Sequence, residues 1–262
     1  MKAFELAYLT IQPVYPFLYR LVRRRLRDFA KSRPGCLSVL DVGGRKSHYT
    51  IGLPIRVTIT DLPRETNIQY QLNLGITSDI IHQLKARRSN VDRVLIDDMT
   101  QSALADAMFD CVVAVEVLEH VLEDDLFVRQ VHRVLKPSGV FLMTTPNGDF
   151  VKNTNPDHKR HYTRQALQSL LKTQFPEVSV QFAVVGGVWH RRGLRSWSWR
   201  HPWRTLSSMI GNFVNAMQSS QASVQSQAMG SRHLLAVARK PEHSTLASAT
   251  ASLASVGPAE KH

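Results

Sequence analysis

The stretch LSVLDVGGRKSHYT, residues 37–50, decides how the fold is read. Its first half is an apolar run interrupted by Asp41, and it delivers the chain to Gly43 and Gly44. A strand followed at once by glycines is typical of a ligand-binding turn in an open α/β sheet. The second half, however, carries RKSH at 45–48 in place of further glycines. The loop therefore suits a ligand that needs its first half and tolerates its second.

Apolar runs rich in Val, Ile and Leu recur along the chain and alternate with helix-like segments. This alternation is typical of parallel strands joined by crossover helices. The sequence thus predicts an α/β fold with a doubly wound, mostly parallel sheet of seven strands. The strands are expected at residues 36–42, 55–62, 92–99, 110–117, 140–147, 178–187 and 233–240.

Helices between these strands have recognisable ends. Ser78 and Thr163 are the residue types that cap helix N-termini, and Pro137 and Gly139 are expected to stop a helix. The expected helices cover 78–89, 122–139 and 164–175.

Acidic residues stand at or near the carboxyl ends of several predicted strands. In open parallel sheets, ligands bind at that edge, where the strand order reverses. A single acid there is more often a helix N-cap or a loop residue, whereas a series indicates a shared site. The series consists of Asp41, Asp61, Asp97, Asp98 and Glu116.

The loop after Gly44 restricts the ligand. A dinucleotide needs G-x-G-x-x-G so that its pyrophosphate reaches backbone amides, and the chain has no Walker motif for ATP. S-adenosylmethionine (SAM) has no phosphate, so it needs one tight glycine turn and a carboxylate for its ribose. Asp61 follows Gly43 by 18 residues, close to the spacing of about 20 residues at which an acid meets ribose hydroxyls.

Four motifs make residues 36–175 resemble a class I SAM-dependent methyltransferase of the type 11 kind. They are VLDVGGRKS, TITDLP, IDDMTQSALADAMFDCVVAVEVLEHV and VLKPSGVFLMTTPN. The resemblance implies a Rossmann-like methyltransferase fold and SAM as the cofactor. Arg45 and Ser47 stand where the family has two glycines.

Carried over by position, the resemblance also implies a cofactor site. Gly43 and Gly44 would turn under the methionine moiety, and Asp61 would bind the ribose hydroxyls. Asp98 and the Met99 backbone would read the adenine. The full expected set is Asp41, Gly43, Gly44, Asp61, Leu62, Asp98, Met99 and Glu116.

Histidines supply candidates for the chemistry. An oxygen acceptor must lose a proton during methyl transfer, and histidine is the usual base near neutral pH. His120 follows the fourth predicted strand, and His158 and His161 follow the fifth. Each alone is more often structural or solvated, but together they form the expected catalytic set.

A divalent metal ion is a further expectation for the same rim. Glu116, Glu119, His120 and His158 could hold an ion against two adjacent hydroxyls. The pattern is similar to metal-assisted O-methyltransferases of ubiquinone biosynthesis and to small-RNA 3′-end 2′-O-methyltransferases. LEHV also occurs in family members without a metal, where Glu119 would cap a helix and His120 would line the acceptor pocket.

Positive charge is concentrated at the two flanks of the chain. The formal net charge is +12, yet residues 34–185 hold 16 basic against 17 acidic side chains. Residues 1–33 hold eight basic against two acidic ones, and no acid occurs between Glu177 and Glu242, where eight basic residues do. This distribution indicates an anionic partner surface rather than an anionic substrate.

Both flanks combine arginines with apolar side chains. The segment 17–31 predicts a helix with Leu18, Leu21, Val22, Leu26 and Phe29 on one face and Arg20, Arg23, Arg24 and Arg27 on the other. The segment 189–203 holds all four tryptophans. Three interpretations stay open: packing as a lid, docking on an anionic membrane, or stacking on unpaired bases. The one-sided apolar face favours membrane over nucleic acid.

The expected organisation has five parts. A basic amphipathic cap covers 1–35, a SAM-binding core 36–187, a Trp/Arg-rich insertion 188–232, the last strand 233–240 and a disordered tail 241–262. The first twenty residues lack the uninterrupted apolar segment of a signal peptide or membrane span. Cys36 and Cys111 lie in apolar runs and are expected to be buried, reduced thiols. We therefore expect a cytoplasmic protein, peripheral at the inner membrane surface if it docks there.

The sequence leads to one leading functional hypothesis and two alternatives. The leading hypothesis is methyl transfer from SAM to a small or lipid-linked acceptor, at oxygen. The first alternative is an RNA ribose methyltransferase that uses the metal set, and the second is a non-catalytic binding module that kept the fold. No feature of the sequence indicates an oligomeric state.

Overall fold

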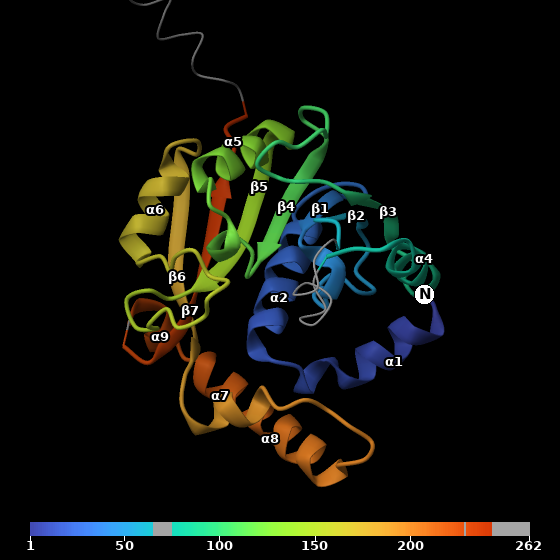
Figure 1. Ribbon diagram of the computed structural model, residues 1–262, viewed down its shortest axis with the longest axis vertical. Helices are drawn as coiled ribbons and strands as arrows, with labels where there is room; N and C mark the ends of the chain where they lie inside the picture. Colours follow the sequence, from blue (N-terminus) through green and yellow to red (C-terminus); the bar gives the residue numbers. More distant parts are fainter. Residues whose placement is uncertain (65–74, 228, 243–262) are drawn as a thin grey trace, which may run out of the picture.

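A computed structural model describes residues 1–64, 75–227 and 229–242 (Figure 1). Seven strands form one sheet in the order β3-β2-β1-β4-β5-β7-β6. Neighbouring strands are parallel except that β7 runs antiparallel to both β5 and β6. This confirms the predicted fold class. The strands are β1 (Ser38–Val42), β2 (Arg56–Asp61), β3 (Val91–Ile96), β4 (Phe109–Val115), β5 (Leu135–Pro146), β6 (Glu177–Val185) and β7 (Ser231–Arg239).

Helices cover both faces of the sheet, because adjacent strand residues point to opposite sides. Val39 and Leu40 are both fully buried, but they belong to different core layers. One layer lies under α2 and α4, and the other under α5 and α6. The α-helices are α1 (Ala3–Ile11), α2 (Phe17–Lys31), α4 (Ser78–Arg87), α5 (Asp124–Val134), α6 (Arg164–Lys172), α7 (Val188–Gly193), α8 (Pro202–Ser219) and α9 (Ala222–Ser226). The 3-10 turns are η1 (Gln12–Val14), η2 (Gly44–Lys46) and η3 (Leu118–His120).

The predicted helix ends have mixed outcomes. The Thr163 hydroxyl accepts a hydrogen bond from the Ala166 amide at 3.1 Å, so the predicted N-cap of α6 is confirmed. The N-cap of α4 is Thr77 rather than Ser78, and its side chain makes no capping bond. Helix α5 ends at Val134, before the predicted stop, because the next residues already pair as the start of β5.

The apolar face of α2 packs against the sheet. Leu18, Leu21, Val22 and Leu26 are all buried in the core layer that α2 shares with the strands. Arg23 is buried as well, and its guanidinium donates hydrogen bonds to backbone carbonyl groups of the loop after β1. This face is therefore unavailable to lipid. Using it to argue for membrane docking is wrong, and α2 packs on the body as a cap.

The insertion between β6 and β7 lies at the carboxyl edge of the sheet. Val185, at the end of β6, pairs with Ser231, and Pro146, at the end of β5, pairs with His233. The chain thus leaves β6 and enters β7 where β4 and β5 terminate. Figure 1 shows α7 and α8 beyond this end of the sheet.

Three further expectations concern the whole chain. Cys111 is buried as predicted. Cys36 is exposed, because it lies before the amino end of β1. Most of the predicted disordered tail, 243–262, lies outside the described residues. Within the described part of the chain, no helix combines the length and apolar character needed to cross a membrane.

Candidate active site

The carboxyl edge brings the predicted site residues into one row. Val42 pairs with Thr60 on one side and Ala114 on the other, so β1, β2 and β4 end level with one another. The Gly43 amide continues this pairing by donating to the Thr60 carbonyl at 2.8 Å. Asp61 pairs with Ile96 at the end of β3. The residues that follow these strands therefore face a common edge.

Gly43 and Gly44 form the turn that begins the site. Gly43 has φ +66°, in the left-handed region that glycine adopts without strain. A Cβ on Gly44 would overlap the carboxyl group of Asp41. Both glycines are therefore required by the backbone path, and the turn leaves no side chain between the strand end and a ligand.

Asp41 lies behind this turn rather than on its ligand side. Its side chain is fully buried and accepts a hydrogen bond from the Tyr49 hydroxyl, with the Thr50 hydroxyl at 3.5 Å. Burial raises the pKa of Asp41 to about 6, although Ser47 and Arg88 act in the opposite direction. The expected cofactor contact is thus corrected: Asp41 supports the loop from beneath.

Arg88 is the partner that sequence reasoning missed. It is buried and donates to the Ser47 carbonyl at 3.4 Å and to the Thr50 hydroxyl. Ser47 in turn donates to the Gly44 carbonyl at 2.7 Å. Side-chain hydrogen bonds therefore fix the second half of the loop, where the resembled family uses glycines. Arg88 directly follows α4, and no periodicity of the sequence marks it.

Asp61 stands at the end of β2, partly exposed beside the altered loop. One carboxylate oxygen accepts from the Leu62 amide at 2.9 Å. Burial raises the pKa of Asp61 even though the positive charges of Arg45, Lys46 and Arg64 lower it. A desolvated carboxylate favours hydrogen-bond donors, and the hydroxyls of a ribose are such donors. Asp61 therefore fits the predicted role.

The segment after β3 is the predicted adenine end. The Asp98 carboxylate accepts from the Thr100 amide at 2.9 Å and from the Thr100 hydroxyl at 2.8 Å, which fixes the turn. Met99 is buried in the core layer next to it, and Leu62 is exposed. The exposed Leu62 side chain could pack against the flat adenine ring, and the backbone of the turn could bind its polar edge.

Glu116 directly follows β4 and has φ +55°, a strained conformation for a non-glycine residue. Its carboxylate lies 3.2 Å from His233 Nδ1 on β7 and accepts from the Thr144 hydroxyl at 2.9 Å. Burial raises the pKa of Glu116, but His233, Thr144 and His158 together outweigh burial and lower it. Glu116 is therefore an anion held in place by two strands. His233 was not among the predicted residues.

Glu119, His120 and His158 converge on one point. One potential ligand atom from each lies within 4.8 Å of the others. Glu116 is not part of this group, so the predicted four-residue metal set is corrected to three. Glu119 is buried, and its Oε1 has no hydrogen-bond partner among the residues that the structure describes. Burial and the charge of Glu116 raise the pKa of Glu119 well above its usual value.

Hydrogen bonds set the tautomers of the histidines. His161 Nδ1 lies 2.8 Å from the Val151 carbonyl, which can only accept, so His161 Nε2 is left as an acceptor. His158 Nδ1, 2.8 Å from that nitrogen, is then the donor. The Nε2 lone pair of His158 is therefore available. His120 Nδ1 lies 3.2 Å from the Asp157 carbonyl, which frees its Nε2 in the same way.

This relay changes the predicted role of His161. It stands behind His158 and holds its ring, which favours a positioning role for His161 over a catalytic one. The loop that carries both is fastened to the neighbouring turn, because the Lys159 amide donates to the Glu119 carbonyl at 2.7 Å. Arg160 adds an ion pair with Asp124 at 2.8 Å. The loop that carries Glu119 and the loop that carries His158 are thus held together by hydrogen bonds and an ion pair.

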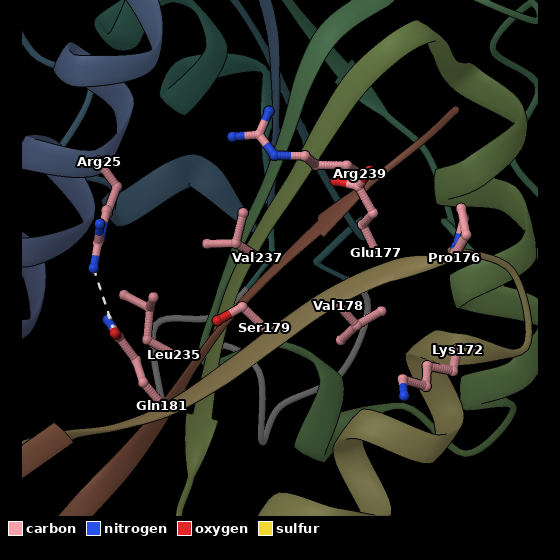
Figure 2. A pocket seen from close by; sticks show the side chains of 10 residues that line it. All are labelled: Arg25, Lys172, Pro176, Glu177, Val178, Ser179, Gln181, Leu235, Val237 and Arg239. Carbon is pink, nitrogen blue, oxygen red and sulfur yellow. Dashed lines mark hydrogen bonds between the residues drawn. The ribbon is translucent and has the colours of Figure 1, made fainter. Parts of the chain in front are cut away.

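A cavity of about 510 Å³ lies away from this edge, against β6 and β7. Figure 2 shows Arg25 of α2 and Lys172 of α6 on either side of it, with strand side chains such as Val237 between them. Glu177 and Arg239, which also line it, lie at the opposite edge of the sheet from Glu116. This cavity is therefore not the acceptor site.

The comparisons agree with this geometry. Residues 68–143 match the family described as "Methyltransferase domain". A protein of Mycolicibacterium smegmatis, named a probable S-adenosylmethionine-dependent methyltransferase, is 35% identical over 148 residues, 55% of this chain and 56% of its own length. A similarly named protein of Mycobacterium tuberculosis is 30% identical over 137 residues, 50% of this chain and 47% of its own. The chain thus spans about half the length of these curated relatives.

Two solved structures show the same fold at low identity. A SAM-dependent methyltransferase from Archaeoglobus fulgidus has a TM-score of 0.53 at 18% identity, with 85% of this chain and 94% of the other covered. The 1,6-didemethyltoxoflavin-N1-methyltransferase of Burkholderia thailandensis has a TM-score of 0.50 at 17% identity, with 86% and 78% covered. The family match and the named relatives show that the chain contains a SAM-dependent methyltransferase domain, and the solved structures show that its fold is one that such enzymes have.

Proposed function

We propose that this protein transfers a methyl group from SAM to a hydroxyl oxygen of a small or lipid-linked acceptor. The observation that carries the proposal is the free Nε2 lone pair of His158, held beside Glu119 by the relay through His161. A base at this position is what an oxygen acceptor requires and a neutral amine does not.

The chain's own residues would hold the cofactor along the carboxyl edge. Gly43 and Gly44 leave room for the methionine moiety, Asp61 offers acceptor oxygens to the ribose, and Asp98 fixes the turn beside the adenine. When bound, SAM supplies an activated methyl group. Partial burial lowers the pKa of His158, and nearby His120 and His161 lower it further, so the ring is neutral near pH 7 and can take the hydroxyl proton.

Calorimetry with SAM and with its demethylated product tests the cofactor half of the proposal. Micromolar binding is expected, whereas no heat at millimolar ligand would favour the non-catalytic alternative. Mass spectrometry of ligands that co-purify with the protein tests the acceptor half. Incubating the co-purified acceptor with SAM should add one methyl group at oxygen, and methylation at nitrogen would contradict the role given to His158.

A metal-assisted site is a second candidate, favoured by the orphaned Oε1 of Glu119. A buried carboxylate oxygen without a donor is satisfied either by a proton or by a cation. Two imidazole nitrogens and one carboxylate would suit Mn²⁺ or Zn²⁺. A metal here would serve adjacent hydroxyls, as at an RNA 3′ end.

Titration with Mn²⁺ followed by calorimetry tests this site directly. Glu119→Gln should abolish binding, while Glu116→Gln, which changes the carboxylate outside the group, should leave it within about threefold. Loss of binding in both variants, or in neither, would contradict the three-residue site. Activity that survives a chelator would exclude the metal-assisted reaction and keep the His158 one.

A further inference from the structure

Helix α8 of the insertion presents its apolar side to solvent. Trp203, Leu206, Ile210, Phe213 and Met217 recur every three or four residues, so they form one stripe along the helix. Each is between 47% and 82% exposed. Trp199, just before the helix, is fully exposed. A surface helix normally turns such a stripe inward, so the stripe requires a covering partner.

The opposite face of α8 is small and polar, and it is the buried one. Ser208 donates to the Gly193 carbonyl at 2.9 Å and accepts from Trp197 Nε1 at 3.1 Å. Asn215 donates to the Val185 carbonyl at 2.7 Å. The Ser219 hydroxyl accepts from the Val185 amide at 3.0 Å. Specific hydrogen bonds therefore fix the rotation of the helix with its apolar stripe outward.

Close packing on α7 fixes it further. A Cβ on Gly211 would lie 2.9 Å from the Gly193 amide nitrogen, and a Cβ on Gly193 would overlap the Asn212 side chain. Turning α8 to bury its stripe would place bulky side chains where only glycine fits. The outward stripe is thus built into the sequence of both helices.

Charge around the stripe identifies the covering partner. Arg200 and Arg204, both exposed, adjoin the stripe in sequence, and no acid occurs between Glu177 and Glu242. The exposed arginines of the insertion are Arg191, Arg192, Arg195, Arg200 and Arg204. A second copy of the chain would bring like charges together without a counter-charge. Nucleic acid would suit the arginines and tryptophans but not Leu206, Ile210 and Met217.

A second cationic feature lies next to α8. Arg20, Arg23, Arg24 and Arg27 line a cavity of about 190 Å³ between α2 and η1, and α8 contacts both elements. The buried Arg20 Nη1 has no hydrogen-bond partner among the described residues. A desolvated guanidinium favours an anion, so the phosphate of a lipid headgroup suits this cavity.

We propose that the stripe of α8, with Trp199, Arg200 and Arg204, docks the protein on an anionic lipid bilayer. Tryptophan and aliphatic side chains bury in the headgroup region, and arginines bind anionic lipid. Because the insertion leaves and re-enters the sheet at the carboxyl edge, docking would place the acceptor end of the site next to the bilayer. The proposal does not depend on methyl transfer: calorimetry with SAM tests catalysis, and vesicle binding tests docking.

Vesicle flotation tests the docking surface. The protein should float with vesicles of phosphatidylcholine and phosphatidylglycerol and bind pure phosphatidylcholine at least tenfold more weakly. Ile210→Ser/Phe213→Ser should weaken binding at least tenfold, and Arg200→Glu/Arg204→Glu should remove the preference for phosphatidylglycerol. Leu122→Ser, a change at an equally exposed apolar side chain outside the stripe, should float like the wild type.

Separate measurements report on the fold of the variants and on which side chains enter the bilayer. The variants should keep the wild-type melting temperature and SAM affinity, since the substituted side chains are exposed. Tryptophan emission should shift to the blue on adding anionic vesicles, and Trp199→Phe/Trp203→Phe should lose that shift while still floating. The proposal is overturned if the wild type does not float or if the Ile210→Ser/Phe213→Ser variant floats equally well. Two further outcomes would overturn it, provided that vesicles bind neither the wild type nor the variant. In the first, the variant is a monomer where the wild type is a dimer. In the second, the variant loses a binding to single-stranded RNA that the wild type has.

Discussion

The two ends of the carboxyl edge are built differently. The nucleotide end is assembled from separate strands, with Gly43 after β1, Asp61 at the end of β2 and Asp98 after β3. The acceptor end comes from two loops that are tied together through the Glu119 carbonyl. Strand-end groups are placed by the sheet and can be recognised one at a time. Loop groups are placed by their own hydrogen bonds, so the proposed chemistry would depend on cooperation among side chains.

The largest expected effect separates chemistry from binding. His158→Ala should lower the rate of methyl transfer at saturating SAM by about 10²- to 10⁴-fold, the usual contribution of a general base. SAM affinity should stay within about twofold, since His158 belongs to the other end of the edge. Rapid-quench single turnovers and calorimetry measure the two quantities.

The pH profile of the wild type sharpens this result. Because the pKa of His158 is lowered, the base is unprotonated above that value, and the rate should rise with pH with a midpoint below 6.5, the ordinary value for histidine. The acid limb should disappear in His158→Ala. An unchanged limb would assign the base to another residue.

At the predicted nucleotide end, we expect the opposite pattern: a loss of SAM affinity with little change in the rate of methyl transfer. Asp61→Ala should weaken SAM binding more than tenfold, because the ribose hydroxyls lose their acceptor. The turnover rate at saturating SAM should change little. Asp92→Ala, on the same half of the sheet with an exposed ion pair to Arg93, serves as the control. Equal SAM affinity in Asp61→Ala and Asp92→Ala would contradict the ribose assignment.

A smaller effect tests cooperation at the acceptor end. His161→Phe should reduce the rate about tenfold and shift the acid limb of the pH profile, since His158 loses the acceptor that fixes its tautomer. His161→Gln should restore both, because an amide can accept from His158 and donate to the Val151 carbonyl. A rate loss without a shift of the limb would indicate a structural role only.

The smallest effect concerns the altered loop. Arg45→Gly restores a family glycine and removes a cation that acts on Asp61. SAM affinity should be unchanged or should rise by up to about fivefold, because Ser47, Thr50 and Arg88 hold the loop independently. A tenfold loss of affinity in calorimetry would show that Arg45 itself binds the cofactor.

The seven strands and the row of acids could be predicted because apolar runs and strand-end positions are local properties of the sequence. The role of Asp41 could not, since its environment depends on how the loop folds Tyr49 back onto it and on Arg88, which follows α4. His233 was missed for a similar reason. It reaches Glu116 only because β7 pairs with β5.

The two amphipathic helices show the same limit. The sequences of α2 and α8 each predict one buried apolar face. The apolar face is buried in α2 and exposed in α8. In α8, polar side chains satisfy backbone groups such as the Val185 amide and carbonyl, which a periodic pattern does not reveal. Periodicity therefore identifies the apolar face of a helix, but it does not determine which face packs against the rest of the protein.

Three aromatic rings join the insertion to the cofactor loop. The Tyr15 ring lies 4.9 Å from that of His48 and 5.2 Å from that of Trp197. Tyr15 therefore links the insertion to the loop that follows Gly44. A displacement of the insertion on docking, as proposed above, would be passed through this ring to the loop beside the predicted place of the methyl donor.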